Sequence, residues 1–139
     1  AKENGISYSV LEKKVLGKSF FEEFEKIVPI DTNLIVLAGY MRIIGKTLLD
    51  AYEGKIVNIH PALLPAFPGR DGITDALNYG VKIMGVTVHY VDAGIDTGKI
   101  IDQSCFKRSG QESKEEIINR IHELEHELYP QVIERLLEL

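Results

Sequence analysis

Residues 55–69 decide the fold, and they read Lys55-Ile56-Val57-Asn58-Ile59-His60-Pro61-Ala62-Leu63-Leu64-Pro65-Ala66-Phe67-Pro68-Gly69. The run from Ile56 to Ile59 is too short for a helix and rich in β-branched residues, which predicts a buried strand. Three prolines follow within eight residues, and each fixes its own φ and pushes the preceding residue toward extended geometry. The segment after the strand is therefore a stiff loop, which holds its side chains in place at little further entropic cost.

Asn58 and His60 interrupt the apolar pattern just where this strand should end. An amide donor, a titratable imidazole and a stiff loop together resemble a catalytic loop. The same residues also fit a proline-rich surface connection with a capping Asn and a solvated His. Taken alone, these residues leave both interpretations open.

The composition is that of one ordinary globular domain. The chain has 139 residues, 45% hydrophobic and 27% charged content, and a formal net charge of −5. This length predicts a single domain over residues 1–139. The acidic balance argues against nucleic-acid binding, which needs a basic face. It does not argue against a small phosphorylated substrate, because that needs only a local pocket.

Cysteine content and apolar runs predict the cellular setting. Cys105 is the single cysteine, so it cannot form an internal disulfide, and it indicates no metal cluster. No apolar run approaches the length of a membrane span, and no secretory signal opens the chain. We therefore expect a reducing, cytoplasmic setting and no membrane contact.

Strands and helices are predicted to alternate before the opening stretch. Strands are expected at Ile6–Val10 and, buried on both faces, at Leu34–Ala38. An amphipathic helix that opens on a capping box at Ser19 lies between them, and a helix over Thr47–Tyr52 follows. Right-handed crossovers between such units predict an α/β fold, with an open, mostly parallel sheet and helices on both faces.

Two loops leave the carboxyl ends of these predicted strands, Gly39–Gly45 and Asn58–Gly69. Ligands of parallel sheets bind outside the carboxyl ends of the strands. We therefore expect the two loops to lie side by side on the functional edge, which favours the catalytic interpretation of Asn58 and His60.

The second half of the chain predicts a helix, two strands and a long final helix. A short helix is expected at Asp75–Asn78, and strands at Val81–Val91 and Ile100–Phe106, whose short link makes them antiparallel. A second capping box at Ser113 opens the final helix. Pro130 should kink or split that helix, because proline removes a backbone donor and clashes with the preceding turn.

Asn58, His60 and Asp96 are the residues that best fit catalysis. Attack of an amine on a carbonyl-like carbon creates an oxyanion, which an Asn amide and an imidazolium stabilise. A carboxylate near the imidazole favours its charged form, and it can take or relay a proton directly or through water. The other interpretation of Asp96 is a turn residue in a Gly-flanked loop.

Other polar residues fit structural roles better on their positions alone. Arg42 fits a solvated arginine in an apolar loop, and His89 fits a satisfied structural histidine on a strand. Glu125 and His126 fit the wet face of the final helix. Cys105 fits a core position better than a nucleophile.

Several motifs together resemble folate-dependent formyltransferases of the glycinamide ribonucleotide transformylase type. They are Asn58-Ile59-His60-Pro61-Ala62-Leu63-Leu64-Pro65 followed by Gly69, then Leu37 to Ile44, Val88 to Gly98, and Glu125-His126 to Tyr129-Pro130. The resemblance covers nearly the whole chain in the family's order. The ending Phe67-Pro68-Gly69 is more similar to the purine branch than to the transfer-RNA or sugar branches.

The resemblance implies transfer of the formyl group of 10-formyltetrahydrofolate to the amine of 5-phosphoribosylglycinamide, a step of purine synthesis that needs no metal. It implies that Asn58 and His60 stabilise the oxyanion, while Asp96 assists His60 and helps to deprotonate the amine. It also implies a cis peptide bond between Leu64 and Pro65.

The resemblance further implies which residues bind the two small molecules. The pterin pocket would be lined, largely through backbone groups, by two segments: Met41, Arg42, Ile43 and Ile44, and Asp92, Ala93, Gly94 and Ile95. The other substrate would be bound by Gly39, Pro61 and Glu125, with Glu125 reaching the ribose hydroxyls.

One departure from the family concerns the substrate phosphate. The family begins with a strand and a Gly-Ser-Gly loop that holds this phosphate, whereas Ala1 aligns to the end of the family's second helix. We therefore expect the carboxy-terminal catalytic portion of a Rossmann-like formyltransferase, with its amino-terminal strand–helix units missing and a complementing fragment as a partner. The alternatives are a formyltetrahydrofolate hydrolase, in which water replaces the amine, and a non-catalytic folate-binding fragment.

Overall fold

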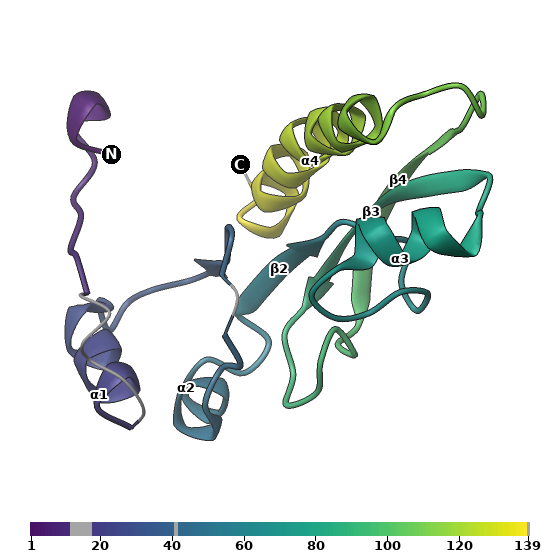
Figure 1. Ribbon diagram of the computed structural model, residues 1–139. Helices are drawn as coiled ribbons and strands as arrows, with labels where there is room; N and C mark the ends of the chain where they lie inside the picture. The colour runs from purple at the N-terminus through teal and green to yellow at the C-terminus, as the bar shows by residue number, and fades with distance from the viewer. Residues whose placement is uncertain (12–17, 41, 139) are drawn as a thin grey trace.

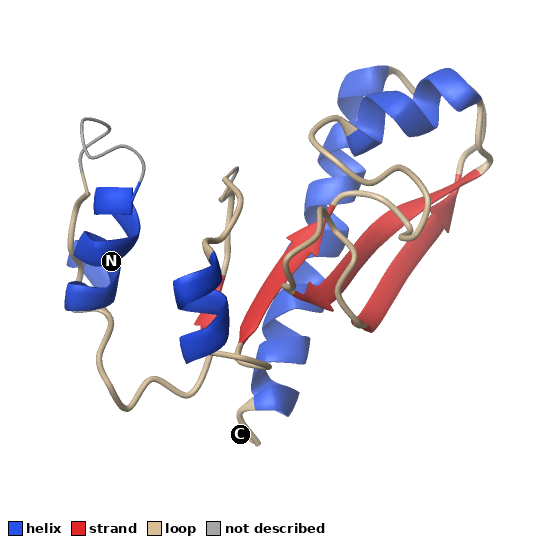
Figure 2. Cartoon of the chain, turned by 90° about the horizontal axis from the view of Figure 1, so that it is seen from below, coloured by secondary structure: helices blue, strands red, loops and turns tan. Residues whose placement is uncertain are grey.

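The computed structural model describes residues 1–11, 18–40 and 42–138 (Figure 1). The elements, in chain order, are the 3-10 helix η1 (Lys2–Asn4), α1 (Lys18–Ile27), β1 (Ile35–Val36), α2 (Lys46–Ala51), β2 (Ile56–His60), α3 (Gly72–Tyr79), β3 (Ile83–Tyr90), β4 (Ile100–Lys107) and α4 (Lys114–Leu136). The strands form one sheet in the order β1-β2-β3-β4. Figure 2 shows α4 running along one face of this sheet. None of the helices in the described ranges is long and apolar enough to cross a membrane.

The sheet confirms the α/β class, and it is mixed. β1 and β2 are parallel, whereas β2–β3 and β3–β4 are antiparallel, the latter as predicted. The expected mostly parallel arrangement therefore does not describe these four strands. The reason is the path after β2: the chain leaves at His60 and returns beside it, where His60 pairs with Thr87. The intervening segment contains α3.

Two strand predictions near the start of the chain are wrong. Residues 6–10 are exposed and form no strand, because alternating side chains do not make a strand without a neighbour for the backbone. The strand expected at Leu34–Ala38 shortens to β1, and Val36 is 38% exposed rather than buried on both faces. β1 is the end strand of the described sheet, so it is paired along one edge only.

The predicted helices are present, with shifted ends. The helix expected at Thr47–Tyr52 is α2, and the helix expected at Asp75–Asn78 lengthens to α3. α1 is described from Lys18, which places Ser19 inside the helix rather than at its N-cap.

The final helix begins as the sequence predicts and does not split. Ser113 Oγ accepts from the Glu116 amide at 3.1 Å, and the Glu116 carboxylate accepts from the Ser113 amide at 2.7 Å, which confirms the capping box. α4 then continues through Pro130. Proline has no backbone N–H, so the carbonyl one turn earlier in the helix has no helical donor. Because Pro130 is exposed, this carbonyl lies on the solvent-facing side of the helix.

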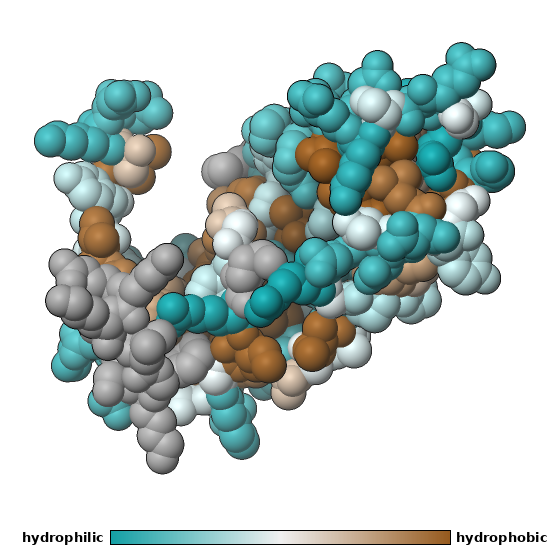
Figure 3. Space-filling view, viewed as in Figure 1, coloured by the Kyte–Doolittle hydropathy of each residue, from teal (hydrophilic) through white to brown (hydrophobic). Residues whose placement is uncertain are grey.

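The core lies between α4 and the sheet. The buried face of the helix packs on the central strands through Ile117, Ile121, Leu128 and Val132 of α4 and Val57, Val86, Val88 and Phe106 of the strands. Hydrophilic residues cover most of the outward side of α4 (Figure 3). Cys105 is exposed, which corrects its predicted core position. Successive residues of a strand face opposite sides, and in β4 it is Phe106 that faces the core.

Tyr129 joins α4 to the parallel strands. Its hydroxyl donates to the Leu37 carbonyl at 2.7 Å and lies 3.1 Å from the Val57 carbonyl. Burial raises the pKa of the Tyr129 phenol, so the neutral, donating form is strongly favoured. One hydroxyl therefore serves carbonyls of β2 and of the segment that follows β1.

Replacing Tyr129 with Phe should lower the free energy of unfolding by about 1–3 kcal/mol, because a buried carbonyl loses its donor. Urea denaturation followed by circular dichroism measures the change. Tyr79→Phe is the matched control, since Tyr79 is 81% exposed and should change stability by less than about 0.5 kcal/mol. Equal stabilities for the two variants would contradict the role assigned to Tyr129.

Candidate active site

A cleft of about 480 Å³ opens where β1 and β2 end. Residues of Gly39–Gly45 and Asn58–Gly69 both line it, so the two loops expected at the functional edge do share one site. Asp92, Gly94, Ile95, Asp96 and Thr97, together with Glu125 of α4, also contribute to the lining. This volume falls within the range of about 300–1,000 Å³ typical of small-molecule sites.

Asn58 and His60 line the cleft from the C-terminal half of β2. They are two residues apart on a strand, so both side chains lie on the same face of the sheet. Asn58 is half-buried and lines the cleft. His60 is buried, and both of its ring nitrogens have neighbours that fix its orientation.

The imidazole of His60 is held between a carbonyl and a carboxylate. Nε2 lies 2.7 Å from the Phe67 carbonyl, and since a carbonyl only accepts, Nε2 carries a proton. Nδ1 lies 3.5 Å from Asp96 Oδ2. Gly72 packs beneath this arrangement, where a Cβ would come within 3.0 Å of Nε2 and 3.1 Å of the Phe67 oxygen. Nδ1 is therefore the ring nitrogen left for chemistry.

Asp96 is the centre of the charged part of the site. Its Oδ2 accepts from the Gly69 amide at 2.8 Å, and its Oδ1 lies 3.6 Å from His89 Nε2. The backbone at Asp96 is left-handed, with φ 54°, which directs a side chain that is only 14% exposed into the cleft. One carboxylate thus faces His60, His89 and the end of the proline-rich loop.

Asp92 shapes the loop that carries Asp96. Its Oδ1 accepts from Thr97 Oγ1 at 2.6 Å and from the Gly94 amide at 2.9 Å. The hydrogen bond from Thr97 lowers the pKa of the Asp92 carboxyl, and the bond from Gly94 adds to this effect. The turn residue of this loop is therefore Asp92, which leaves the carboxylate of Asp96 to the cleft.

His89 is the residue that sequence reasoning missed. Its Nδ1 lies 2.9 Å from the Tyr90 carbonyl and therefore donates. Its buried Nε2 faces Asp96 without a hydrogen bond in the described part of the chain. The signal that could have found it is strand pairing, because the antiparallel register sets His89 directly opposite Asn58.

Thr87 anchors the stiff loop to the sheet. Its hydroxyl donates to the Ala62 carbonyl at 2.7 Å and accepts from the Leu64 amide at 3.1 Å. Gln103 of β4 donates to the Leu64 carbonyl and to the same hydroxyl, both at 2.9 Å. The Leu64–Pro65 peptide bond is cis, as the resemblance implies.

The structure places most, though not all, of the expected binding residues at the cleft. The cleft lining includes Arg42, Ile43, Ile44, Asp92, Gly94 and Ile95 from the expected pterin segments, and Gly39, Pro61 and Glu125 from the expected substrate set. Ala93 does not contribute to it. Met41 lies outside the described residues. Arg42, expected as a solvated arginine, has its guanidinium 5.0 Å from the centroid of the Phe20 ring.

Tyr40 adds an unexpected polar group to the cleft wall. Its hydroxyl is buried and has no hydrogen-bond partner within the described ranges. Burial raises the pKa of this phenol, so the hydroxyl keeps its proton and can donate. A buried hydroxyl without a partner is costly unless a ligand satisfies it.

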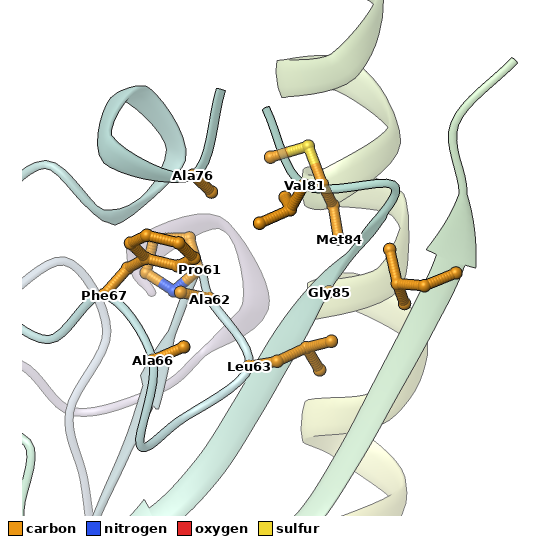
Figure 4. A pocket seen from close by; sticks show the side chains of 10 residues that line it. Pro61, Ala62, Leu63, Ala66, Phe67, Ala76, Val81, Met84 and Gly85 are labelled. Carbon is orange, nitrogen blue, oxygen red and sulfur yellow. The ribbon is translucent and has the colours of Figure 1, made fainter. Parts of the chain in front are cut away.

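A second, smaller cavity lies behind the proline-rich loop (Figure 4). It measures about 140 Å³, and its walls are apolar, with Phe67 on one side and Ala76, Val81 and Met84 on the other. Pro61 lines both this cavity and the cleft. Among the described residues, no charged residue lines the small cavity, whereas His60, Asp92 and Asp96 line the larger cleft.

Comparison with known proteins agrees with this geometry, since residues 1–133 match the family described as formyl transferase. The chain belongs to the formyl transferase family. Over 135 residues it is 51% identical to a phosphoribosylglycinamide formyltransferase of Bacillus subtilis. The aligned region covers 96% of this chain and 69% of that protein. A protein of the same name from Mycobacterium tuberculosis is 48% identical over 98 residues, or 70% of the chain and 46% of that protein.

Solved structures show the same formyl transferase fold. The phosphoribosylglycinamide formyltransferase of Bacillus halodurans superposes with a TM-score of 0.89 at 43% identity, over 98% of this chain and 72% of that one. A formyltetrahydrofolate deformylase of Pseudomonas syringae reaches a TM-score of 0.88 at 28% identity, over 99% of this chain and 47% of that one.

The acceptor role of Asp96 can be separated from its charge. Asp96→Asn keeps an oxygen that can accept from the Gly69 amide, whereas Asp96→Ala removes it. We expect hydrogen exchange at the Gly69 amide to accelerate about tenfold or more in the Ala variant, because the loss of this hydrogen bond costs about 1.4 kcal/mol or more. In the Asn variant the exchange rate should change little. Amide exchange followed by NMR measures both; equal protection in the two variants would show that the loop is held by other contacts.

Proposed function

We propose that this chain carries the catalytic portion of an enzyme that transfers the formyl group of 10-formyltetrahydrofolate to the amine of 5-phosphoribosylglycinamide, in cytoplasmic purine synthesis. The convergence of Asn58, His60 and Asp96 at one cleft is the observation that carries the proposal. The Bacillus subtilis relative bears the name of this activity at 51% identity.

The proposed reaction begins with attack of the substrate amine on the formyl carbon. A C–N bond forms, and the electron pair of the carbonyl moves to the oxygen, which becomes an oxyanion. The Asn58 amide donates to this oxygen, and so does His60 through a proton on Nδ1, because Nε2 is occupied by the Phe67 carbonyl. Each such donor contributes about 2.7–4 kcal/mol to stabilising the oxyanion in comparable enzymes.

Collapse of the tetrahedral intermediate moves two protons. The attacking nitrogen carries a positive charge and must lose one proton, while N10 of the folate leaves with the electron pair of the broken bond and needs one. Asp96 lies 3.5 Å from Nδ1 of His60, which is within reach of relay through water. Asp96 and His60 together can therefore take the first proton and supply the second.

Two buried polar atoms on the cleft wall are available for ligand recognition. The Tyr40 hydroxyl and His89 Nε2 both lack hydrogen-bond partners in the described ranges. We assign the apolar and backbone surface of residues 42–44 and of Asp92, Gly94 and Ile95 to the pterin. We assign Glu125 to the ribose hydroxyls. We assign the phosphate contact to a complementing amino-terminal segment, as in the family pattern.

Hydrolysis of formyltetrahydrofolate is the second candidate, and the Pseudomonas syringae deformylase supports it with a TM-score of 0.88. The identity of 28% is lower than the 51% of the Bacillus subtilis transferase and the 43% of the Bacillus halodurans transferase, so transfer to the amine remains the first proposal. The two reactions share the folate and differ in the nucleophile.

The first test measures loss of the formyl group from 10-formyltetrahydrofolate, with and without 5-phosphoribosylglycinamide. The chain is assayed alone and mixed with the amino-terminal segment of the Bacillus subtilis relative. We expect turnover that requires the amine substrate. Equal turnover without it would establish the hydrolase, and no turnover by a folded mixture that binds folate would leave a non-catalytic binding protein.

Single substitutions then test the oxyanion donors. Asn58→Ala and His60→Ala should each lower kcat by about 10²–10³-fold with a smaller change in KM, because both donors act mainly on the charge of the transition state. Asn78→Ala on α3 is the matched control, since Asn78 is exposed and outside the cleft lining. A rise in KM with an unchanged kcat for Asn58→Ala would contradict its catalytic role and leave it as a binding residue.

A further inference from the structure

The outward face of α4 carries two histidines that the proposed chemistry does not use. His122 and His126 are one helical turn apart, so their side chains project from the same face. Their ring centroids are 6.5 Å apart, and the rings are 18° from parallel. Two imidazoles side by side at this spacing are the starting point of a metal chelate.

His122 has the carboxylate partner that metal-binding histidines usually have. Its Nδ1 lies 3.0 Å from Glu125 Oε2, and because the carboxylate accepts, Nδ1 carries the proton. Nε2 of His122 therefore presents its lone pair. A carboxylate in this position fixes the tautomer of a metal-binding histidine.

The two imidazole rings need to move only slightly closer together to bind one ion. Two imidazole nitrogens at about 2.0–2.1 Å from Zn²⁺ place their ring centroids about 5 Å apart in tetrahedral coordination. Side-chain rotation can supply the difference from the observed 6.5 Å, since His122 is 54% exposed and His126 is exposed as well. Exposed Glu123 and Glu127 add negative charge that attracts a cation.

We propose that His122 and His126 bind a divalent transition-metal ion, Zn²⁺ foremost, on the surface of α4, with Glu125 as the orienting carboxylate. Imidazole ligands suit Zn²⁺ and exclude Mg²⁺, which prefers oxygen. No group of three His, Cys, Asp or Glu residues in the described ranges is placed to hold an ion, so the proposed site has two protein ligands.

Residues 122–126 read His-Glu-Leu-Glu-His, which is also the spacing of metalloprotease helices. In those enzymes the first glutamate acts as a general base on metal-bound water. Here the carboxylate that contacts the imidazole belongs to Glu125, whereas Glu123 is exposed. Catalytic zinc sites have three protein ligands, and the described ranges place no third ligand here, so we propose ion binding and no hydrolytic activity.

The site has a physical link to the cleft, and this link rests on the proposed function. Glu125 lines the cleft and also accepts from His122. A metal on Nε2 strengthens the Nδ1–H···carboxylate bond, so the ion and the ribose hydroxyls compete for Glu125. Binding free energies at two linked sites change reciprocally, and Zn²⁺ should therefore raise the KM for the ribonucleotide.

Calorimetric titration of the full chain with ZnCl₂, and with MgCl₂ as the ion control, tests the site without reference to activity. We expect one Zn²⁺ per chain and no Mg²⁺ response. His122→Gln and His126→Gln should each weaken Zn²⁺ binding at least tenfold, and Glu125→Gln about tenfold. Glu123→Gln is the matched control and should change the affinity less than twofold. Unchanged binding in both histidine variants, or loss of binding in Glu123→Gln, would overturn the proposal.

The link is tested separately in the complemented enzyme. Zn²⁺ should raise the KM for 5-phosphoribosylglycinamide at least twofold in the unmodified chain and leave KM unchanged in His126→Gln. If the chain binds Zn²⁺ but its KM does not change with Zn²⁺, the link to the cleft is refuted and the metal site itself is still supported. If the enzyme shows no transfer at all, the proposed function fails, whereas the calorimetric result still decides the metal site.

Discussion

The antiparallel register between β2 and β3 is the constraint on which the rest of the site depends. It sets Asn58 opposite His89 and His60 opposite Thr87. The first pair brings a second imidazole to Asp96, and the second brings the hydroxyl that anchors the proline-rich loop. A slip of one residue would turn every one of these side chains to the other face of the sheet. The buried Val57, Val86 and Val88 fix the register, because they must face the core.

Local patterns predicted what depends on local physics. The strand at Ile56–Ile59, the capping box at Ser113 and the antiparallel β3–β4 pair follow from side-chain size, backbone donors and a short link, and all are present. The failures depend on neighbours. Residues 6–10 alternate like a strand but have no strand partner in the described structure, and the return of the chain beside β2 is set by the path of a loop.

The site shows the same division between residue type and spatial arrangement. Chemistry singled out Asn58, His60 and Asp96, and the structure places all three on one cleft. Spacing could not show that His89 faces Asp96, because the two residues come from a strand and from the loop beyond it. It also could not distinguish Asp92 from Asp96, since both lie in one Gly-flanked loop and only the hydrogen bonds separate the turn former from the cleft carboxylate.

The bond between His60 Nε2 and the Phe67 carbonyl has a consequence for how this site can vary over evolution. The acceptor is a main-chain atom, so no replacement of a side chain deletes it. The orientation of the imidazole is inherited through the path of the loop rather than through a partner residue. Drift at exposed positions such as Ala66 therefore leaves the ring in place, whereas any side chain at Gly72 would crowd both the ring nitrogen of His60 and the Phe67 carbonyl that holds it.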